Sequence, residues 1–156
     1  MPSSIVTNAS PLIALHQIGH LELLPHLFDT ILIPPAVAAE IATIRPQPEW
    51  LQEQVLSQPI GPQILRISLG PGESEAISLA LEIESALILL DDRPARRLAQ
   101  MLGLSVVGTL GILLAAKKHE LITEVRPLLS ALRTNNFHIA DTLYEMVLRD
   151  ARESDS

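Results

Sequence analysis

The stretch that decides the fold runs from Gly70 to Arg97 and reads GPGESEAISLALEIESALILLDDRPARR. Its Gly-Pro-Gly start is typical of a turn, and Glu73 then opens a helix, where a carboxylate suits the positive end of the helix dipole. The continuous apolar run at 86–90 predicts a strand that is covered on both faces. Asp91 and Asp92 follow this strand directly. The stretch therefore predicts acidic side chains at a helix start and at a strand end.

Length and composition restrict the class of protein. A chain of 156 residues is the size of one domain, and its 47% hydrophobic content is enough to build a core. No apolar run approaches the roughly 18 residues of a membrane-spanning helix. The N-terminal sequence MPSSIVTNAS lacks the basic and apolar segments of a secretory signal, so we expect a cytoplasmic protein. The absence of cysteine excludes disulfides, thiolate metal sites and thiol catalysis.

The charge balance also bears on partners. A net charge of −7 argues against broad attraction to phosphate backbones. An acidic protein still binds nucleic acid where metal ions neutralise a carboxylate cluster and local arginines contact the phosphates.

The order of elements predicts an α/β fold with three layers, in which helices cover both faces of a parallel sheet of about five short strands. We expect one domain over residues 1–149 and a polar, frayed C-terminal tail at 150–156. The proline-rich stretch 45–62 indicates an irregular connection with a helical piece around Trp50. The expected strands are 5–6, 30–33, 64–68, 86–90 and 105–107, and the expected helices include 21–28, 93–102, 109–118, 121–132 and 139–148.

Ligands of open α/β sheets bind outside the carboxyl ends of the strands. In the predicted sheet, polar residues follow four strands: Asn8 the first, Glu73 the third, Asp91 and Asp92 the fourth, and Thr109 the fifth. Hard cations such as Mg²⁺ take oxygen ligands and usually only one or two carboxylates. The predicted edge therefore suits a metal ion that activates water and stabilises charge on a phosphoryl group.

Each acid also has a purely structural explanation. An aspartate after a strand is often a helix N-cap, which applies equally to Asp91 and Asp92. Glu73 fits an ordinary acid of a first helical turn, and Glu40 fits a solvated residue beside an apolar helix face. The remaining glutamates of the central stretch are expected to be solvated: Glu75, Glu82 and Glu84.

Three arginines follow the aspartates: Arg93, Arg96 and Arg97. They stand at a helix start, where the dipole disfavours cations. Ion pairs with the neighbouring acids and contacts with phosphates explain them equally well. The glycines match neither a Walker pattern nor GxGxxG, and they are interpreted as turns.

Five segments together resemble the PIN-domain superfamily: IVTNASPLIAL at 5–15, IPPAVAAE at 33–40, GESEAISLA at 72–80, LLDDRPARR at 89–97 and VGTLGILLAAK at 107–117. They cover most of the chain in the right order. More narrowly, the chain looks like the prokaryotic branch of predicted nucleic-acid-binding PIN proteins, which are similar to VapC-like toxins of toxin–antitoxin systems.

The resemblance implies a compact α/β/α fold and a Mg²⁺- or Mn²⁺-dependent ribonuclease with several acids in one pocket. Carried over by position, it implies catalytic acids at Glu40, Glu73 and Asp91 or Asp92. Asn8 departs from the pattern, which has an aspartate at the end of the first strand; an amide oxygen coordinates a metal but brings no charge. The implied metal ligands are Asn8, Glu73, Asp91 and Asp92, and the expected nucleic-acid contacts are Arg93, Arg96, Arg97 and Thr109.

The leading interpretation is a metal-dependent endoribonuclease that hydrolyses RNA phosphodiesters, as the toxin of a pair with a small antitoxin protein. The alternative is a PIN fold that does not cleave and serves as an RNA-binding or protein-interaction module, which Asn8 favours. A flavodoxin-like or receiver-like domain shares the acidic edge but lacks a comparable phosphoacceptor context. Apolar helices at 21–28 and 110–116 predict a homodimer, because a small sheet covers only part of their surface.

Overall fold

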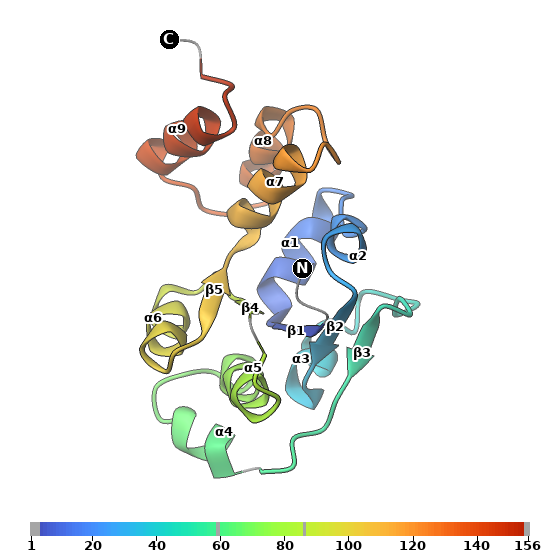
Figure 1. Cartoon of the computed structure of the whole chain (residues 1–156), viewed down its shortest axis with the longest axis vertical. Coiled ribbons are helices and arrows are strands. Elements are labelled where there is room, and N and C mark those ends of the chain that lie inside the picture. Colours follow the sequence, from blue (N-terminus) through green and yellow to red (C-terminus); the bar gives the residue numbers. More distant parts are fainter. Residues whose placement is uncertain (1–3, 59, 86, 155–156) are drawn as a thin grey trace.

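Five parallel strands form a single sheet at the centre of the molecule (Figure 1). The computed structural model describes residues 4–58, 60–85 and 87–154. The spatial order of the strands is β3-β2-β1-β4-β5. Their bounds are β1 (Ser4–Thr7), β2 (Thr30–Ile33), β3 (Leu51–Glu53), β4 (Leu87–Leu89) and β5 (Ser105–Val107).

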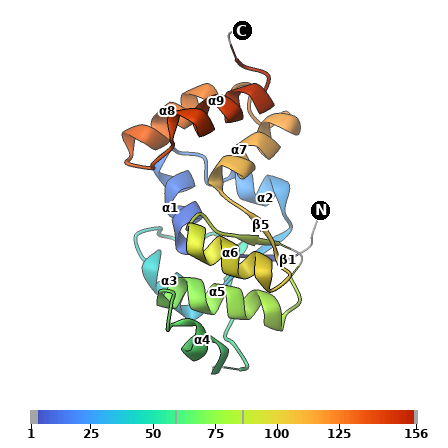
Figure 2. The same ribbon diagram turned by 90° about the vertical axis from the view of Figure 1, so that its left-hand side faces the viewer.

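Helices cover both faces of this sheet. The helices α1, α2 and α7 lie on one side, and α3, α4 and α5 lie on the other, while α6 packs beside β5 (Figures 1 and 2). This arrangement confirms the expected three-layer α/β/α fold. In the part of the chain that the structure describes, the helices are α1 (Ala9–Gln17), α2 (Leu23–Leu27), α3 (Pro35–Glu40), α4 (Ile60–Leu65), α5 (Pro71–Glu82), α6 (Arg93–Met101), α7 (Thr109–Lys118), α8 (Arg126–Thr134) and α9 (Asp141–Asp150).

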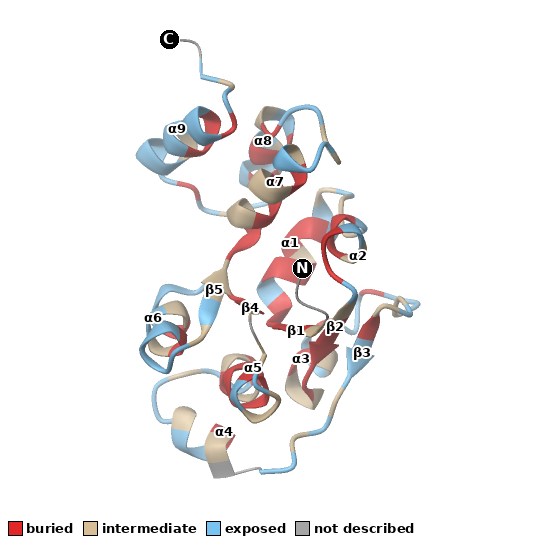
Figure 3. Ribbon diagram, viewed as in Figure 1, coloured by how far each residue is buried: buried red, intermediate tan, exposed pale blue. Residues whose placement is uncertain are grey.

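The middle strand β1 is the most enclosed part of the core. It pairs with β2 through Ile5↔Ile31 and with β4 through Val6↔Ile88, and all four of these side chains are fully buried (Figure 3). Because helices cover both faces, consecutive residues are apolar and no polar alternation appears. The strands predicted at 5–6, 30–33 and 105–107 are confirmed. Of the strand predicted at 86–90, residues 87–89 form β4, and residue 86 lies outside the described residues.

The prediction of a strand at 64–68 is wrong. Residues Ile60–Leu65 form the helix α4, and Ile64 and Ile67 are 61% and 87% exposed. A short apolar run is ambiguous between strand and helix, and here it packs α4 against α5 while its large side chains remain in solvent.

The true edge strand β3 lies inside the proline-rich connection, so the helical piece expected around Trp50 is also wrong. The backbone nitrogen of Ile31 donates to the carbonyl of Trp50 at 3.1 Å, and Leu51 pairs with Ile31 and is 2% exposed. A strand of three residues with one buried side chain has no detectable period, because a period-2 signal needs at least four residues.

The C-terminal segment packs tightly as far as Glu153, so the expectation of a frayed tail is wrong for residues 151–153. The Glu153 carboxylate accepts hydrogen bonds from the backbone nitrogens of Val125 and Arg126 at 2.8 and 3.1 Å. It also pairs with the Lys117 ammonium at 2.8 Å. Since α8 has no side-chain cap of its own, Glu153 satisfies the free N–H groups at its start.

Removing the Glu153 carboxylate is expected to destabilise the protein. Burial opposes ionisation, but the bonds from Lys117, Val125 and Arg126 outweigh it and hold the pKa of Glu153 below its ordinary value of 4.5. A depressed pKa stabilises the fold above the unfolded-state pKa, and this stabilisation is lost as the pH falls through the folded-state pKa. Glu153→Ala should lower the free energy of unfolding by about 1–3 kcal/mol at pH 7, measured by urea denaturation.

The difference between wild type and Glu153→Ala should shrink as the pH falls below 4.5. The matched control is Glu145→Ala, which removes an exposed glutamate of α9 and should change stability by less than about 0.5 kcal/mol. Equal effects of the two substitutions would contradict the capping role.

Candidate functional site

The carboxyl ends of β1 and β4 bring two predicted site residues to the same edge of the sheet. The backbone nitrogen of Asn8 donates to the carbonyl of Leu89 at 3.0 Å, and Asp91 follows two residues after Leu89. Neighbouring strands are only about 4.8 Å apart. Asn8 and Asp91 therefore leave adjacent strands at neighbouring points.

Asn8 and Glu40 converge over Gly72, which lies in the first turn of α5. A Cβ added at Gly72 would collide with the Glu40 carboxylate and stand 3.1 Å from the Asn8 Oδ1 atom. Glu40 is the last residue of α3, so β1, α3 and α5 meet at this point. The residue at position 72 has no side chain, and that leaves room for the two oxygen atoms.

The Asn8 side chain has an unusual environment. Asn8 is 3% exposed, and its Oδ1 atom is buried with no hydrogen-bond partner among the described residues. An acceptor left unpaired in the interior is costly, and native structures rarely keep one without a reason. Together with the neighbouring Glu40 carboxylate, it places two oxygen acceptors side by side at Gly72.

Glu40 also lies in a negative field. Glu40 is an exposed residue, but partial desolvation of its carboxylate, followed by the carboxylates of Glu73 and Glu75, raises its pKa above the ordinary value. The Glu73 carboxylate turns back toward the start of α5, where its Oε2 atom lies 2.9 Å from the position of a Cβ built at Gly70. Three glutamates thus concentrate negative charge near the ends of α3 and α5.

Asp91 is held by the start of α7. The backbone nitrogen of Thr109 donates to its Oδ1 atom at 2.8 Å, and the Thr109 hydroxyl donates to Oδ2 at 2.7 Å. Burial raises the pKa of Asp91, while the two Thr109 bonds and the Arg96 guanidinium oppose that rise. Both carboxylate oxygens therefore have a fixed orientation at the edge of the sheet.

The two consecutive aspartates have different contacts. Asp92 is the N-cap of α6, and its Oδ2 atom accepts a hydrogen bond from the backbone nitrogen of Ala95 at 3.1 Å. Its side chain is exposed, whereas Asp91 points to Thr109. The N-cap explanation thus accounts for Asp92.

The three arginines of α6 also differ in their contacts. The Arg96 Nη1 atom donates to the carbonyl of Leu90 at 2.8 Å. A Cβ added at Gly108 would stand 2.7 Å from both that Nη1 atom and Asp91 Oδ1, so the three groups pack closely at the edge of the sheet. Arg93 and Arg97 are exposed on the surface of α6.

Two glutamates that were expected to be solvated are structural, and that expectation is wrong. The Glu75 carboxylate accepts a hydrogen bond from the backbone nitrogen of Ala36 at 2.9 Å and pairs with Arg66 at 3.0 Å. It thereby fixes the start of α3, the helix that carries Glu40. Glu82 accepts hydrogen bonds from the backbone nitrogens of Ser57 and Gln58. These partners are distant in sequence, so no local pattern indicates them.

Glu73 lies near the site for a different reason from the predicted one. The element directly before α5 is the helix α4, so Glu73 does not follow a strand end as the sequence had suggested. It comes near the site because α5 packs against β1 and β4 and its first turn faces α3.

A hard divalent cation takes oxygen donors of the kind found at Gly72, although the acids do not form a cluster there. Within residues 4–58, 60–85 and 87–154, no three His, Cys, Asp or Glu side chains come close enough together to hold a metal ion. Mg²⁺ usually binds proteins through one or two carboxylates and keeps several waters. The Asn8 amide oxygen and the Glu40 carboxylate supply such a small set of oxygen donors.

The fold and this edge define an α/β protein with an acceptor-rich site at the carboxyl ends of its strands. A family model described as PIN domain matches residues 4–153. The match covers nearly the whole chain, and the protein belongs to the PIN-domain family. PIN domains are generally nucleases that act on nucleic acids and typically use divalent metal ions, so the fold is a nuclease fold.

Curated proteins give no significant match to this chain. In the described parts of the chain, none of the helices has the length and apolar character needed to cross a membrane.

The pKa of Glu40 provides a direct test of the geometry at Gly72. Glu73→Gln removes one of the two neighbouring negative charges and should move the pKa of Glu40 toward its ordinary value of 4.5. Carbon-detected NMR titration in metal-free buffer measures this shift. The exposed Glu84→Gln is the matched control and should leave Glu40 unchanged. If both variants give the same Glu40 titration as the wild type, the carboxylates do not interact.

Proposed function

We propose that this protein is a metal-dependent endoribonuclease that hydrolyses RNA phosphodiesters. The observation that supports this most is the buried, unpaired Asn8 Oδ1 atom beside the Glu40 carboxylate at Gly72. Amide and carboxylate oxygen atoms of this kind are the ligands that a hard cation takes. Asp91 lies at the neighbouring strand end, and Glu73 adds negative charge.

The residues then have distinct roles in the proposal. Asn8 and Glu40 hold Mg²⁺ or Mn²⁺, with Asp91 and Glu73 contributing charge or water-mediated contacts. When bound, a divalent cation supplies the positive charge that activates water and offsets the charge developing on the phosphate. Thr109 keeps the Asp91 carboxylate oriented through its nitrogen and hydroxyl.

Arg93 and Arg97 are the proposed contacts to RNA phosphates, since both are exposed and their side chains form no hydrogen bond or ion pair with another described residue. Arg96 acts as a positioning residue, because its guanidinium already binds the Leu90 carbonyl.

Conservative substitutions at Asp91, Glu40 and Asp92 distinguish residues of the proposed site from a residue that only caps a helix. Asp91→Asn and Glu40→Gln should each reduce cleavage of a generic single-stranded RNA by about 100-fold or more, measured with Mn²⁺ or Mg²⁺ and again with chelator. Asp92→Asn is the matched control, because asparagine is an equally good N-cap and the helix should be preserved. Cleavage that survives both Asp91→Asn and Glu40→Gln would exclude this site.

A second candidate function is supported by a specific observation. The residue at the end of β1 is an amide, and the described Asp and Glu side chains do not form a group of three around one point. These features favour a PIN fold that no longer cleaves and serves as an RNA-binding or protein-interaction module. This candidate predicts RNA binding without cleavage under every metal condition.

Replacing Asn8 by Asp distinguishes the two candidates. A unit negative charge about 4 Å from a divalent cation contributes about 8 kcal/mol at an effective dielectric near 20, before desolvation and carboxylate repulsion are subtracted. Asn8→Asp should therefore tighten Mn²⁺ binding by about tenfold or more in calorimetric titration and raise cleavage. In chelator its melting temperature should fall, because a buried charge then lacks a partner.

Ser10→Asp, at an exposed position in α1, is the control for added charge near the same helix. If Asn8→Asp alters neither metal binding nor cleavage, the oxygen atoms at Gly72 are not a cation site.

The cellular role that we propose is that of a cytoplasmic toxin held by a small antitoxin, with a homodimer as the assembled form. This part rests on the resemblance to VapC-like toxins and on exposed apolar side chains such as Ile64, Ile67 and Met101. Induced expression should arrest growth, and co-expression of a small neighbouring reading frame should restore it.

A further inference from the structure

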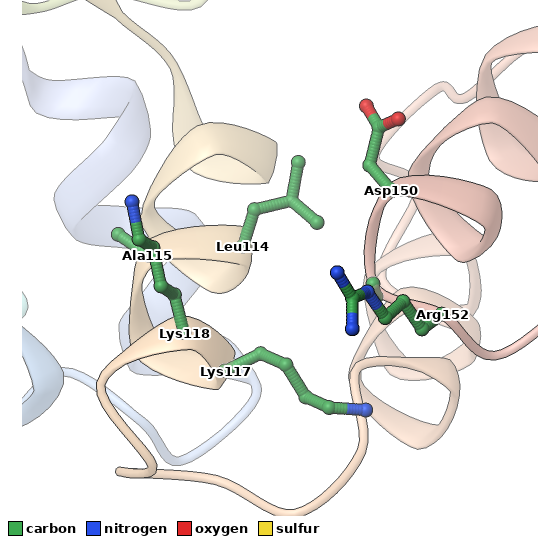
Figure 4. A pocket seen from close by; sticks show the side chains of 7 residues that line it. Leu114, Ala115, Lys117, Lys118, Asp150 and Arg152 are labelled. Atoms are coloured by element: carbon green, nitrogen blue, oxygen red, sulfur yellow. The ribbon is translucent and has the colours of Figure 1, made fainter.

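A cleft of about 510 Å³ lies between the carboxyl ends of α7 and α9, away from the acidic edge of the sheet (Figure 4). Its apolar floor contains Leu114, Ala115 and Ala151. Its charged rim contains Lys117, Lys118, Arg152 and Asp150. Figure 4 shows the Arg152 guanidinium pointing from the end of α9 toward α7.

The rim is a local excess of positive charge in a chain of net charge −7. Lys117 is already paired with Glu153 at 2.8 Å, and the Glu153 carboxylate is also bound to the start of α8. Within the described residues, Lys118 and Arg152 form no ion pair and no side-chain hydrogen bond. Two cations thus remain available, with one carboxylate, Asp150, among them.

The helix dipole explains the two lysines of the rim but not Arg152. Cations near a helix carboxyl end are favoured by the dipole, which accounts for Lys117 and Lys118 in α7. Arg152 follows α9 with a φ of 61°, a conformation that favours glycine or asparagine. The backbone there would prefer glycine, so a backbone requirement does not explain why an arginine occupies this place and faces the cleft.

The cleft and the candidate site lie at the two ends of α7. Thr109, which holds Asp91, opens this helix, and Lys118 ends it. At 1.5 Å per residue the two ends are about 14 Å apart. At the 3.4 Å spacing per nucleotide of a stacked strand, this corresponds to about four nucleotides.

We infer that this cleft binds a backbone phosphate of the RNA, a few nucleotides from the bond at the acidic edge. The inference rests on the proposed function for the choice of RNA as ligand. Lys118 and Arg152, which are both exposed, contact the phosphate from α7 and from the end of α9, and Asp150 limits the affinity. The acidic edge then need not attract RNA by itself.

The test measures RNA binding without cleavage. A labelled single-stranded RNA is titrated with the full-length protein in chelator at several salt concentrations. For single strands, the slope of log affinity against log salt changes by about 0.7 for each phosphate contact. Lys118→Ala and Arg152→Gly should each weaken binding and reduce the magnitude of this slope by about 0.7.

The variants are chosen so that folding does not confuse the result. Glycine suits the φ of 61° at position 152, and alanine suits the helical position 118. Arg149→Ala is the charge-matched control, because Arg149 is an exposed residue of the same helix outside the cleft, and it should leave the slope unchanged. Asp150→Asn should have the opposite effect and tighten binding.

Each outcome decides the inference. Equal slopes for wild type, Lys118→Ala and Arg152→Gly would overturn it, as would an equal effect of Arg149→Ala. Poly-glutamate binding that depends on Lys118 and Arg152, without such dependence for RNA, would make the cleft a protein-docking site and overturn it too. If RNA is cleaved in a way that depends on Asp91 but not on Lys118 and Arg152, the proposed function stands and this inference fails. If RNA binding depends on Lys118 and Arg152 and no cleavage occurs, this inference stands and the proposed function fails.

Discussion

The close approach of α5 to β1 and α3 at Gly72 is the contact on which the site depends. With no side chain at position 72, the Glu40 carboxylate and the Asn8 Oδ1 atom occupy the space that a Cβ would need. The same helix, α5, packs against β1 and β4, so its position is fixed by the core. An oxygen-rich site is thereby built on rigid elements, which is the arrangement that precise ligand geometry requires.

Several carboxylates stabilise the backbone of other elements instead of taking part in the site. Glu75 binds the start of α3, Glu82 binds the connection after β3, and Glu153 binds the start of α8. In each case a charged acceptor satisfies free N–H groups far away in the sequence, and such bonds are stronger than neutral ones. The acidic composition therefore serves the architecture as well as the chemistry, and net charge alone is a poor guide to the ligand.

The fold was predictable where the hydrophobic signal was long or unambiguous. The strands β2 and β5, and the helix α7, were predicted at their observed bounds, because apolar runs and helical periodicity are local properties. The third strand was misplaced because β3 has three residues and one buried side chain, whereas the apolar residues at 64–68 belong to a helix end and a turn. The position of β3 is set by the pairing of Leu51 with Ile31, and no local sequence pattern indicates that partner.

The sequence by itself determined the α/β class, the family resemblance and the candidate acids, since all three follow from residue types in chain order. The tertiary structure alone decided how those residues are used. It brought Asn8 and Glu40 together at Gly72, bound Asp91 to Thr109 and made Asp92 the N-cap of α6. These outcomes depend on distances between segments that are far apart in the chain. Packing of helices against the sheet sets those distances, and local sequence patterns carry no information about them.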